Sequence, residues 1–284
     1  MKKTGIMLCC FLLLVSSCFS EKKDEGGSSG KEAAVEVFFE APASIPSGLI
    51  AYINANQAEF ISELERLIAN DTDNLLILVD KKNLLPADFV PPALVPLSGK
   101  GTSYTISRND LSLRANVEAA LEEMAAAARK EGITLLASST YRSYQYQVQL
   151  YNRYVREMGQ EAADRESARP GASQHQLGTV VDFGSITPEF IRTRAGRWLD
   201  ANAARFGWSL SFPDGYEDVT GYLWECWHYR YIGPEATAFQ QKWFNNIQQY
   251  MLEFIDAWKS FKKIIPETLI PIYTPISLES EMVK

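Results

Sequence analysis

The sequence predicts an α+β fold, and three observations lead to that prediction. The segments 110–131 and 144–157 repeat apolar residues every three or four positions, which is the spacing of amphipathic helices. Short apolar runs of strand length, such as 133–137 and 179–183, occur among the helical segments without regular alternation. The chain has 284 residues, of which 46% are hydrophobic and 12% aromatic, so it is long enough to bury a sizeable core.

The N-terminus has the pattern of a bacterial lipoprotein signal peptide. Two lysines precede an apolar segment, 6–15, that is too short for a comfortable membrane span. This segment leads into Val-Ser-Ser-Cys ending at Cys18, which resembles a lipobox, in which the cysteine is acylated and becomes the new N-terminus. We therefore expect a signal peptide over 1–17 and a lipidated, flexible tether over 18–34. Ordinary secretory cleavage nearby, with Cys18 incidental, is the alternative.

Cysteine content and charge limit the other possibilities. Two of the four cysteines lie in the expected signal peptide and Cys18 would carry lipid, so only Cys226 remains and no intramolecular disulfide can form. We interpret Cys226 as a small packing residue rather than a nucleophile. The net charge of −7 and the lack of a basic block argue against a nucleic-acid partner.

The segment before the main helices is expected to be a small extension followed by an extended region. An N-terminal helical extension is predicted over 35–74, with helical spacing of apolar residues at 56–69. The apolar run 75–79 has the length of a strand. Four prolines in 84–96 require an extended or looped backbone there.

The remaining elements follow in order. The 110–131 helix ends just before Gly132, and a polar loop over 159–171 follows the 144–157 helix. Beyond this loop the predicted elements are a strand at 179–183, a helix at 188–206, short strands at 208–212 and 229–232, and a long amphipathic helix at 236–261.

The chain has only two histidines, and each lies in a short cluster of reactive residues. His175 is followed seven residues later by Asp182, and His228 is preceded three residues earlier by Glu225. Imidazole is the commonest protein ligand of zinc, and catalytic zinc takes three protein ligands and leaves a position for water. Two histidines and Asp182 supply that number, with Glu225 as an additional carboxylate. This is the minimum set for a zinc hydrolase.

The first cluster can converge only through a bend. His175 on a loop or turn and Asp182 on a strand would meet if Gly178 allows the chain to turn between them. The alternative is a loop histidine that is hydrogen-bonded to a nearby carboxylate. Asp182 also begins Asp-Phe-Gly, but no Gly-rich nucleotide loop precedes it, so a kinase is excluded.

The relative position of the two side chains in the second cluster depends on the backbone conformation there. A spacing of three places Glu225 and His228 on opposite faces of a strand but side by side in a turn or helix. Side by side, the carboxylate could take a proton from metal-bound water. The alternative is an aromatic core strand with a satisfied histidine. Because the chain has no other histidine, the two clusters together favour a shared metal site.

These motifs resemble those of the VanY-like D-alanyl-D-alanine carboxypeptidases, a family of zinc peptidases whose fold is shared with the Hedgehog N-terminal domain. The resemblance rests on Ser-x-His-x-x-Gly-x-x-x-Asp at 173–182 and Glu-x-Trp-His at 225–228. Further similar motifs are the strand and Pro-bearing loop at 75–86, Tyr-Arg-Ser with a following Gln at 141–147, and the run-in at 206–222. The resemblance extends over about 75–233, in the order found in the family.

Two positions depart from the family pattern. Val180 stands where the family usually has Ala, which adds bulk near Asp182. Cys226 stands where Pro is common, which could loosen the turn before His228. Neither change removes an expected ligand.

The resemblance implies a role for each motif residue. The fold would be a single catalytic domain over 75–233, with a small antiparallel sheet flanked by helices, followed by a C-terminal helix and tail over 234–284. The family ligands of Zn²⁺ fall on His175, Asp182 and His228, and the general base falls on Glu225. Arg142 occupies the family's arginine position, where a guanidinium could stabilise the oxyanion or bind the substrate's terminal carboxylate. The peptide-contacting positions fall on Gln147 and Ser173.

The implied function is a zinc-dependent carboxypeptidase that removes the terminal D-Ala of peptidoglycan stem peptides. The expected location is extracytoplasmic, with a lipid anchor in a bacterial membrane, and a monomer is expected. An L,D-carboxypeptidase of the same family and a non-catalytic, zinc-stabilised peptidoglycan-binding module are the alternatives. A dipeptidase acting only on free D-Ala-D-Ala fits an anchored protein less well.

Overall fold

The computed structural model describes residues 39–264. The expected signal peptide, Cys18, the tether and the end of the C-terminal tail lie outside the described residues. Among the helices of the described part, none is both long and apolar enough to cross a membrane.

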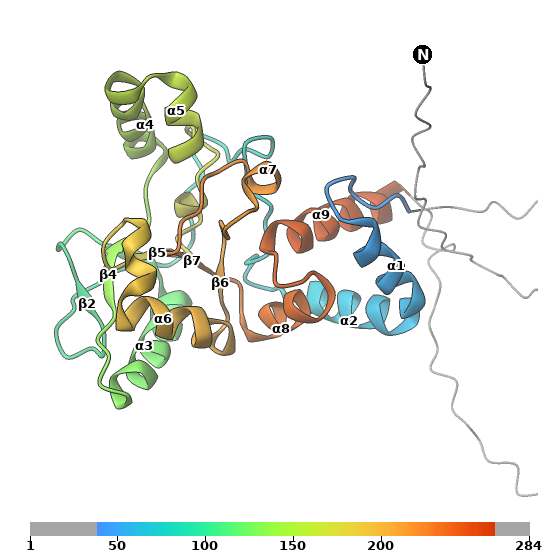
Figure 1. Ribbon diagram of the computed structural model, residues 1–284, viewed down its shortest axis with the longest axis horizontal. Coiled ribbons are helices and arrows are strands. Elements are labelled where there is room, and N and C mark those ends of the chain that lie inside the picture. Colours follow the sequence, from blue (N-terminus) through green and yellow to red (C-terminus); the bar gives the residue numbers. More distant parts are fainter. Residues whose placement is uncertain (1–38, 265–284) are drawn as a thin grey trace, which may run out of the picture.

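A mixed sheet of five strands forms the centre of the molecule (Figure 1). The edge pair β2–β4 is parallel, and the other neighbours are antiparallel. A separate two-stranded sheet pairs β1 with β3 antiparallel. The α+β prediction is therefore confirmed. The strands are β1 Leu94–Pro96, β2 Thr105–Ile106, β3 Ser112–Arg114, β4 Leu136–Ser139, β5 Val180–Phe183, β6 Trp208–Leu210 and β7 His228–Tyr231, and the order in the large sheet is β2-β4-β5-β7-β6.

The two faces of the large sheet differ in chemistry. On β5, Val181 and Phe183 join one hydrophobic core with Tyr229 of β7. Because successive side chains of a strand point to opposite faces, Asp182 and His228 point the other way. The apolar face packs with α3 (Ala115–Lys130) and α6 (Arg194–Asn202). The opposite face is thus left to the polar residues of the site.

A second hydrophobic core joins the two ends of the described chain. It is built from four helices that gather at one end of the molecule (Figure 1). We call this group the helical layer. Aromatic rings fill it, with Phe60 against Trp243 and Phe254 at centroid distances of 5.1 and 5.0 Å. Its helices are α1 Ser47–Ala55, α2 Gln57–Asn70, α8 Pro234–Trp243 and α9 Gln248–Ile264.

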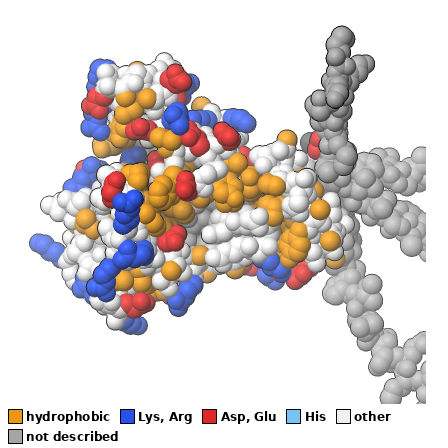
Figure 2. Space-filling model, viewed as in Figure 1, with side chains coloured by type: hydrophobic (Ala, Val, Ile, Leu, Met, Phe, Trp, Pro, Cys, Tyr) orange, Lys and Arg blue, Asp and Glu red, His pale blue; other side chains and the backbone are white. Residues whose placement is uncertain are grey.

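Two further helices form a projecting lobe. The helices α4 (Tyr144–Met158) and α5 (Gln160–Glu166) stand away from the sheet (Figure 1). Figure 2 shows this lobe separated from the body by a hollow, with hydrophobic side chains along the body below it. Within the lobe, the Asp164 carboxylate of α5 accepts hydrogen bonds from Tyr151 Oη of α4 at 2.6 Å and from Arg169 at 2.8 and 2.7 Å. The first of these bonds connects the two helices. The remaining short elements are η1 Gln174–Leu177, η2 Pro188–Arg192, η3 Ala203–Phe206 and α7 Glu217–Thr220.

Several element predictions need correction. The run 75–79 is not a strand. Arg230 Nη2 donates hydrogen bonds to the carbonyl oxygens of Leu75 and Ile77 at 2.6 and 2.8 Å, so these oxygens are not available to a neighbouring strand. The helix expected from residue 110 begins only at Ala115, because the preceding residues form β3. The strand expected at 133–137 is displaced to β4.

Three longer segments are divided differently from the prediction. The loop expected at 159–171 contains α5, and the helix expected at 188–206 is split into η2, α6 and η3. The helix expected at 236–261 breaks into α8 and α9, because Asn245 and Asn246 adopt positive φ angles of 49° and 60°. A left-handed backbone cannot continue a right-handed helix.

Candidate metal centre

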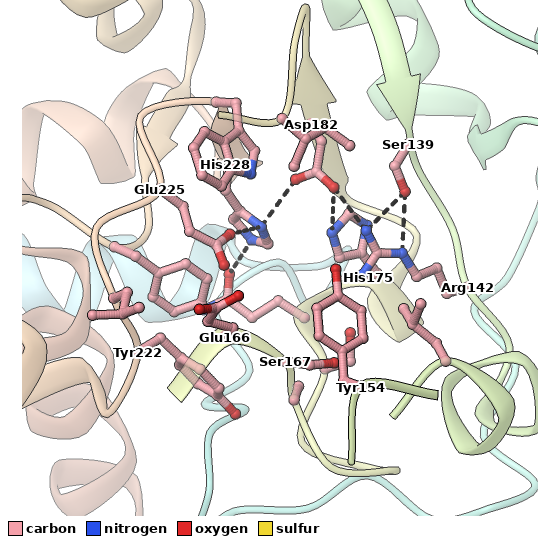
Figure 3. Close-up of a pocket in the computed structure, with 18 of the residues that line it drawn as sticks. Ser139, Arg142, Tyr154, Glu166, Ser167, His175, Asp182, Tyr222, Glu225 and His228 are labelled. Atoms are coloured by element: carbon pink, nitrogen blue, oxygen red, sulfur yellow. Dashed lines mark hydrogen bonds and ion pairs between the residues drawn. The ribbon is translucent and has the colours of Figure 1, made fainter. Parts of the chain in front are cut away.

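His175, Asp182 and His228 converge on one point and could hold a metal ion. Their ligand atoms all lie within 4.8 Å of one another, and all three residues are buried. Asp182 Oδ2 lies 3.2 Å from His175 Nε2, and Asp182 Oδ1 lies 3.1 Å from His228 Nδ1. Figure 3 shows the three side chains pointing toward one another.

Local folding explains the convergence. β5 and β7 are paired in a register that sets Asp182 directly opposite His228. His175 lies on the short helix η1, and Gly178 ends this helix with a left-handed φ of 69°. A Cβ atom at Gly178 would lie 3.0 Å from Pro91 and 3.1 Å from Leu94, so a side chain would crowd the bend as well as strain it. The predicted arrangement of turn, glycine and strand is confirmed.

Each imidazole is held through the nitrogen that points away from the cluster. His175 Nδ1 lies 2.6 Å from the carbonyl oxygen of Thr140, which can only accept, so Nδ1 carries the proton and Nε2 faces the cluster without one. His228 Nε2 lies 3.3 Å from Gln174 Oε1, which leaves Nδ1 for the cluster. Metal-binding histidines are oriented in this way by their outer partners.

The charges around the cluster act differently on the two histidines. Burial and the adjacent Arg142 guanidinium lower the pKa of His175 to about 4. Burial also disfavours protonation of His228, but the carboxylates of Asp182 and Glu225 outweigh it and raise its pKa to about 9. Although burial opposes ionisation of Asp182, the neighbouring histidines and arginine hold its pKa well below the usual value. Because a histidine must be unprotonated at the nitrogen that binds a metal, a metal ion here would compete with a proton for His228.

The donor set fits zinc. Two imidazole nitrogens and one carboxylate are a ligand set of catalytic zinc, and ligands of a tetrahedral zinc lie about 3.3 Å apart at its preferred bond lengths. The two carboxylate-to-imidazole separations come close to this value. Asp182 Oδ1 is also buried without a hydrogen bond from any described residue. A cation between Asp182 Oδ1 and His228 Nδ1 would satisfy both atoms.

Glu225 lies beside the cluster on the turn that leads into β7. The His228 amide donates to the Glu225 carbonyl at 3.0 Å, which is a turn, so the two side chains lie on the same side. Glu225 Oε2 is 3.3 Å from His228 Nδ1, and the Glu225 side chain is 16% exposed. Burial raises the pKa of Glu225 above its usual value. A partly accessible carboxylate next to a metal position is the arrangement that a general base requires.

Arg142 lies on the turn between β4 and α4, and it is paired inside the cluster. Arg142 Nη2 donates to Asp182 Oδ2 at 2.8 Å and to Ser139 Oγ at 2.9 Å. The side chain is 17% exposed and lines a cavity beside the cluster. The guanidinium therefore orients Asp182 and keeps one surface toward the cavity.

The two predicted peptide-contacting residues occupy different places. Ser173 is buried and lines the cavity. Gln147 lies behind the cavity wall, where its Nε2 donates to the Ala168 carbonyl at 2.7 Å. Ser167 and Ala168 do line the cavity, so Gln147 supports the wall. Neither predicted substrate contact is tested by this geometry, and both stay predictions.

The cluster lies on the wall of a cavity of about 470 Å³ between the sheet and the α4–α5 lobe. The lobe contributes both aromatic and charged side chains, and the turn before β7 contributes three tryptophan and tyrosine rings. The lining includes Tyr146, Arg153, Tyr154 and Glu166 from the lobe and Tyr222, Trp224 and Trp227 from the turn. The cluster therefore faces a cavity and not a closed interior.

The residues that hold the expected ligands in place were not predicted from the sequence. Ser139 and Gln174 carry no motif signal of their own, although each is close in sequence to a predicted site residue. Thr140 acts through its backbone carbonyl, which any residue type provides. Only the folded chain identifies these partners.

Comparison with known proteins agrees with this geometry. The family model described as VanY, D-alanyl-D-alanine carboxypeptidase, matches residues 110–234, which include every cluster residue. YodJ of Bacillus subtilis strain 168, whose name assigns it provisionally to the carboxypeptidases, is 32% identical over 63% of this chain and 69% of its own length. A D-alanyl-D-alanine carboxypeptidase of Enterococcus faecalis is 32% identical over 57% of this chain and 60% of its own.

Solved structures are similar over the same region. The LdcB LD-carboxypeptidase superposes with a TM-score of 0.58 at 31% identity, over 65% of this chain and 88% of that one. A Zn(II) complex of a mutant vancomycin resistance D,D-pentapeptidase VanY superposes with a TM-score of 0.53 at 30% identity, over 62% of this chain and 98% of that one.

Proposed function

Because this chain belongs to the VanY family of D-alanyl-D-alanine carboxypeptidases, we propose that it is a zinc-dependent enzyme that removes the terminal D-Ala from peptidoglycan stem peptides. One observation carries the proposal. A buried His-Asp-His cluster has a carboxylate 3.3 Å from one of its histidines, on the wall of an open cavity. That arrangement fits hydrolysis better than binding alone, since a binding module does not need Glu225.

In this proposal His175 Nε2, Asp182 and His228 Nδ1 hold the metal. When bound, zinc supplies an acidified water and polarises the carbonyl group that is attacked. The other roles in the reaction belong to residues of this chain. Thr140 and Gln174 keep the two imidazole rings in the required protonation state through their hydrogen bonds.

Glu225 takes the proton of the attacking water and passes it to the amine that leaves with the terminal D-Ala. Burial raises its pKa above the usual carboxyl value, which makes it a stronger base. Were a metal ion bound, its positive charge would favour the ionised form of Glu225, which is the form that accepts a proton.

Arg142 serves the reaction in two ways. Its hydrogen bond to Asp182 Oδ2 orients that carboxylate. Its surface toward the cavity can meet an anionic group of the peptide, either the developing oxyanion or the terminal carboxylate. Ser173 lies on the same wall and is the second candidate for a peptide contact.

An L,D-carboxypeptidase is the second candidate function. The similarity to the LdcB LD-carboxypeptidase favours it, at a TM-score of 0.58 over 88% of that chain. Both activities use the same ligands and base, so the distinction depends on which residue precedes the bond that is cut.

A mass-spectrometric assay separates the two functions. Protein without residues 1–20 is incubated with zinc and with penta-, tetra- or tripeptide stems. Loss of one alanine from the pentapeptide supports the D,D-activity, and loss from the tetrapeptide alone supports the L,D-activity. Glu225→Gln protein is the matched control. Intact substrates at high enzyme concentration, with zinc bound, would contradict both functions.

An extracytoplasmic, lipid-anchored location completes the proposal. The lipobox-like motif ending at Cys18 supports it, because two acyl chains are enough for lasting membrane attachment. An anchored monomer would be held close to the polymer that carries its substrate.

A further inference from the structure

The first residue of α9 reaches toward the metal cluster from the helical layer. Gln248 is 1% exposed. Its Oε1 accepts a hydrogen bond from Gln174 Nε2 at 3.4 Å and lies 3.2 Å from Ser211 Oγ. Gln174 is in turn the partner of His228. A short chain of side chains thus connects α9 to a predicted metal ligand.

Gln248 presents its amide oxygen to Gln174 and so takes part in setting the hydrogen-bonding directions along this chain. An amide has an acceptor end and a donor end. Because Gln248 Oε1 accepts, the Nε2 end of Gln174 must turn toward it, and the Oε1 end of Gln174 must turn toward His228. Ser211 Oγ donates to the same Gln174 Oε1 at 2.7 Å and supports this orientation.

In the neutral form of His228, the form that can bind a metal, the orientation of Gln174 decides which ring nitrogen is free. With Oε1 facing the ring, His228 Nε2 must carry a proton to donate, so Nδ1 keeps its lone pair for the cluster. If Gln174 turned over, its Nε2 would face His228 Nε2 and favour the other tautomer. That tautomer puts the proton on Nδ1, the atom that faces Asp182 and Glu225.

We propose that Gln248 is a positioning residue for the metal centre, which acts through Gln174 to keep His228 Nδ1 available as a ligand. This inference rests on the proposed zinc site. The inference goes beyond the proposed zinc site because it links the metal centre to α9, which lies outside the matched family region at 110–234. Docking of the helical layer onto the sheet then contributes to metal affinity as well as to stability.

Metal affinity tests the inference without an activity assay. Zinc dissociation constants are measured by chelator competition on the protein without residues 1–20, and visible spectra are recorded with cobalt in place of zinc. Gln174→Met should weaken zinc binding by about 10- to 100-fold, the usual effect of losing an outer partner of a ligand histidine. Gln248→Met should weaken it by roughly 10-fold and change the cobalt spectrum.

A double variant distinguishes positioning from general destabilisation. If Gln248 acts only through Gln174, the Gln174→Met/Gln248→Met protein binds zinc no more weakly than Gln174→Met alone. Gln249→Met is the matched control. Gln249 is the next residue of α9 and donates to Asp80 Oδ2 at 2.9 Å and to Glu253 Oε1 at 2.8 Å, so its loss should lower stability without changing zinc affinity or the cobalt spectrum.

Gln248→Glu provides a second variant should the methionine protein fail to fold. It keeps an oxygen acceptor for Gln174 Nε2 and should bind zinc at least as tightly as the wild type. Unchanged affinity and spectrum in Gln248→Met, or additive losses in the double variant, would overturn the inference while the zinc site stands. A wild-type protein that binds no zinc would instead remove the proposed function, and the inference with it.

Discussion

Arg142 Nη2 donates to Asp182 Oδ2 at 2.8 Å, so the arginine expected to meet the substrate also holds the aspartate of the metal cluster. Asp182 Oδ2 is shared with His175 Nε2 at 3.2 Å, while the other carboxylate oxygen faces His228. Ser139 Oγ accepts hydrogen bonds from Arg142 Nε and Nη2 at 3.1 and 2.9 Å and helps to orient the guanidinium. If the cluster holds a metal and Arg142 meets the substrate, the two roles share the Asp182 carboxylate.

This coupling makes Arg142→Lys informative. Lysine keeps the charge but loses the planar fork, so it cannot bind Asp182 and a substrate anion together. We expect kcat/KM to fall by roughly 10²-fold or more, the range seen when one oxyanion donor is removed. Zinc content should stay normal. A fall in kcat alone favours the oxyanion role, and a rise in KM alone favours binding of the terminal carboxylate. Unchanged kinetics on stem peptides would place Arg142 outside the substrate site.

Replacement of His175, Asp182 or His228 by Ala should remove the metal. Each substitution takes away one of three ligands, so zinc content should fall from about one per chain to near zero after dialysis. Elemental analysis of the purified proteins measures this. Ser173→Ala is the matched control, because Ser173 lines the same cavity without belonging to the cluster. Metal-free wild-type protein after zinc-supplemented expression would refute the assignment.

Glu225→Gln should separate metal binding from catalysis. The amide has almost the same shape but cannot accept a proton from water, so turnover should fall by several orders of magnitude. Zinc content and the unfolding temperature should change little. If the variant keeps near-native turnover with stem peptides, the general base is another group.

The variant Asp164→Asn tests, through the pH dependence of stability, whether the Asp164 carboxylate stabilises the α4–α5 lobe. Hydrogen bonds from Arg169 and Tyr151 lower the pKa of Asp164 from 3.8 to about 2, although burial acts on the pKa in the opposite direction. A lowered pKa in the folded state means that the ionised carboxylate stabilises the fold above about pH 4, and this contribution is lost as the pH falls toward 2. The variant should therefore be less stable by about 1 kcal/mol at pH 7, allowing for solvent screening.

Urea unfolding at several pH values measures that difference. The gap between wild type and Asp164→Asn should shrink toward zero as the pH approaches 2. Glu157→Gln is the control, since the ion pair that Glu157 makes with Arg153 among the described residues is long, at 4.0 Å, and both side chains are exposed. A gap that stays constant with pH would show that the Asp164 carboxylate does not stabilise the lobe.

Cys18→Ser tests the proposed anchor. The serine variant cannot form the thioether to lipid, so it should leave the membrane fraction or accumulate as uncleaved precursor. Metabolic labelling with a fatty-acid analogue should mark the wild type only. Labelling of both proteins to the same extent would exclude Cys18 as the acylation site.

The sequence by itself determined the fold class and the members of the candidate site. Helical spacing predicted α4 closely, and the strand around Asp182 was expected at 179–183 and is found as β5. The clusters around His175 and His228 predicted the convergence now seen. These inferences depend on residue types at short separations, which hold information about local backbone and chemistry.

Only the tertiary structure decided how the site is held. The run 75–79 looks like a strand by composition. Its carbonyl oxygens instead accept hydrogen bonds from the buried guanidinium of Arg230, which is 153 or more residues later in the sequence. Gln248 meets Gln174 across 74 residues. Neither pair leaves a periodic or motif signal, because a hydrogen bond between distant segments depends on where folding brings them and not on their neighbours in the chain.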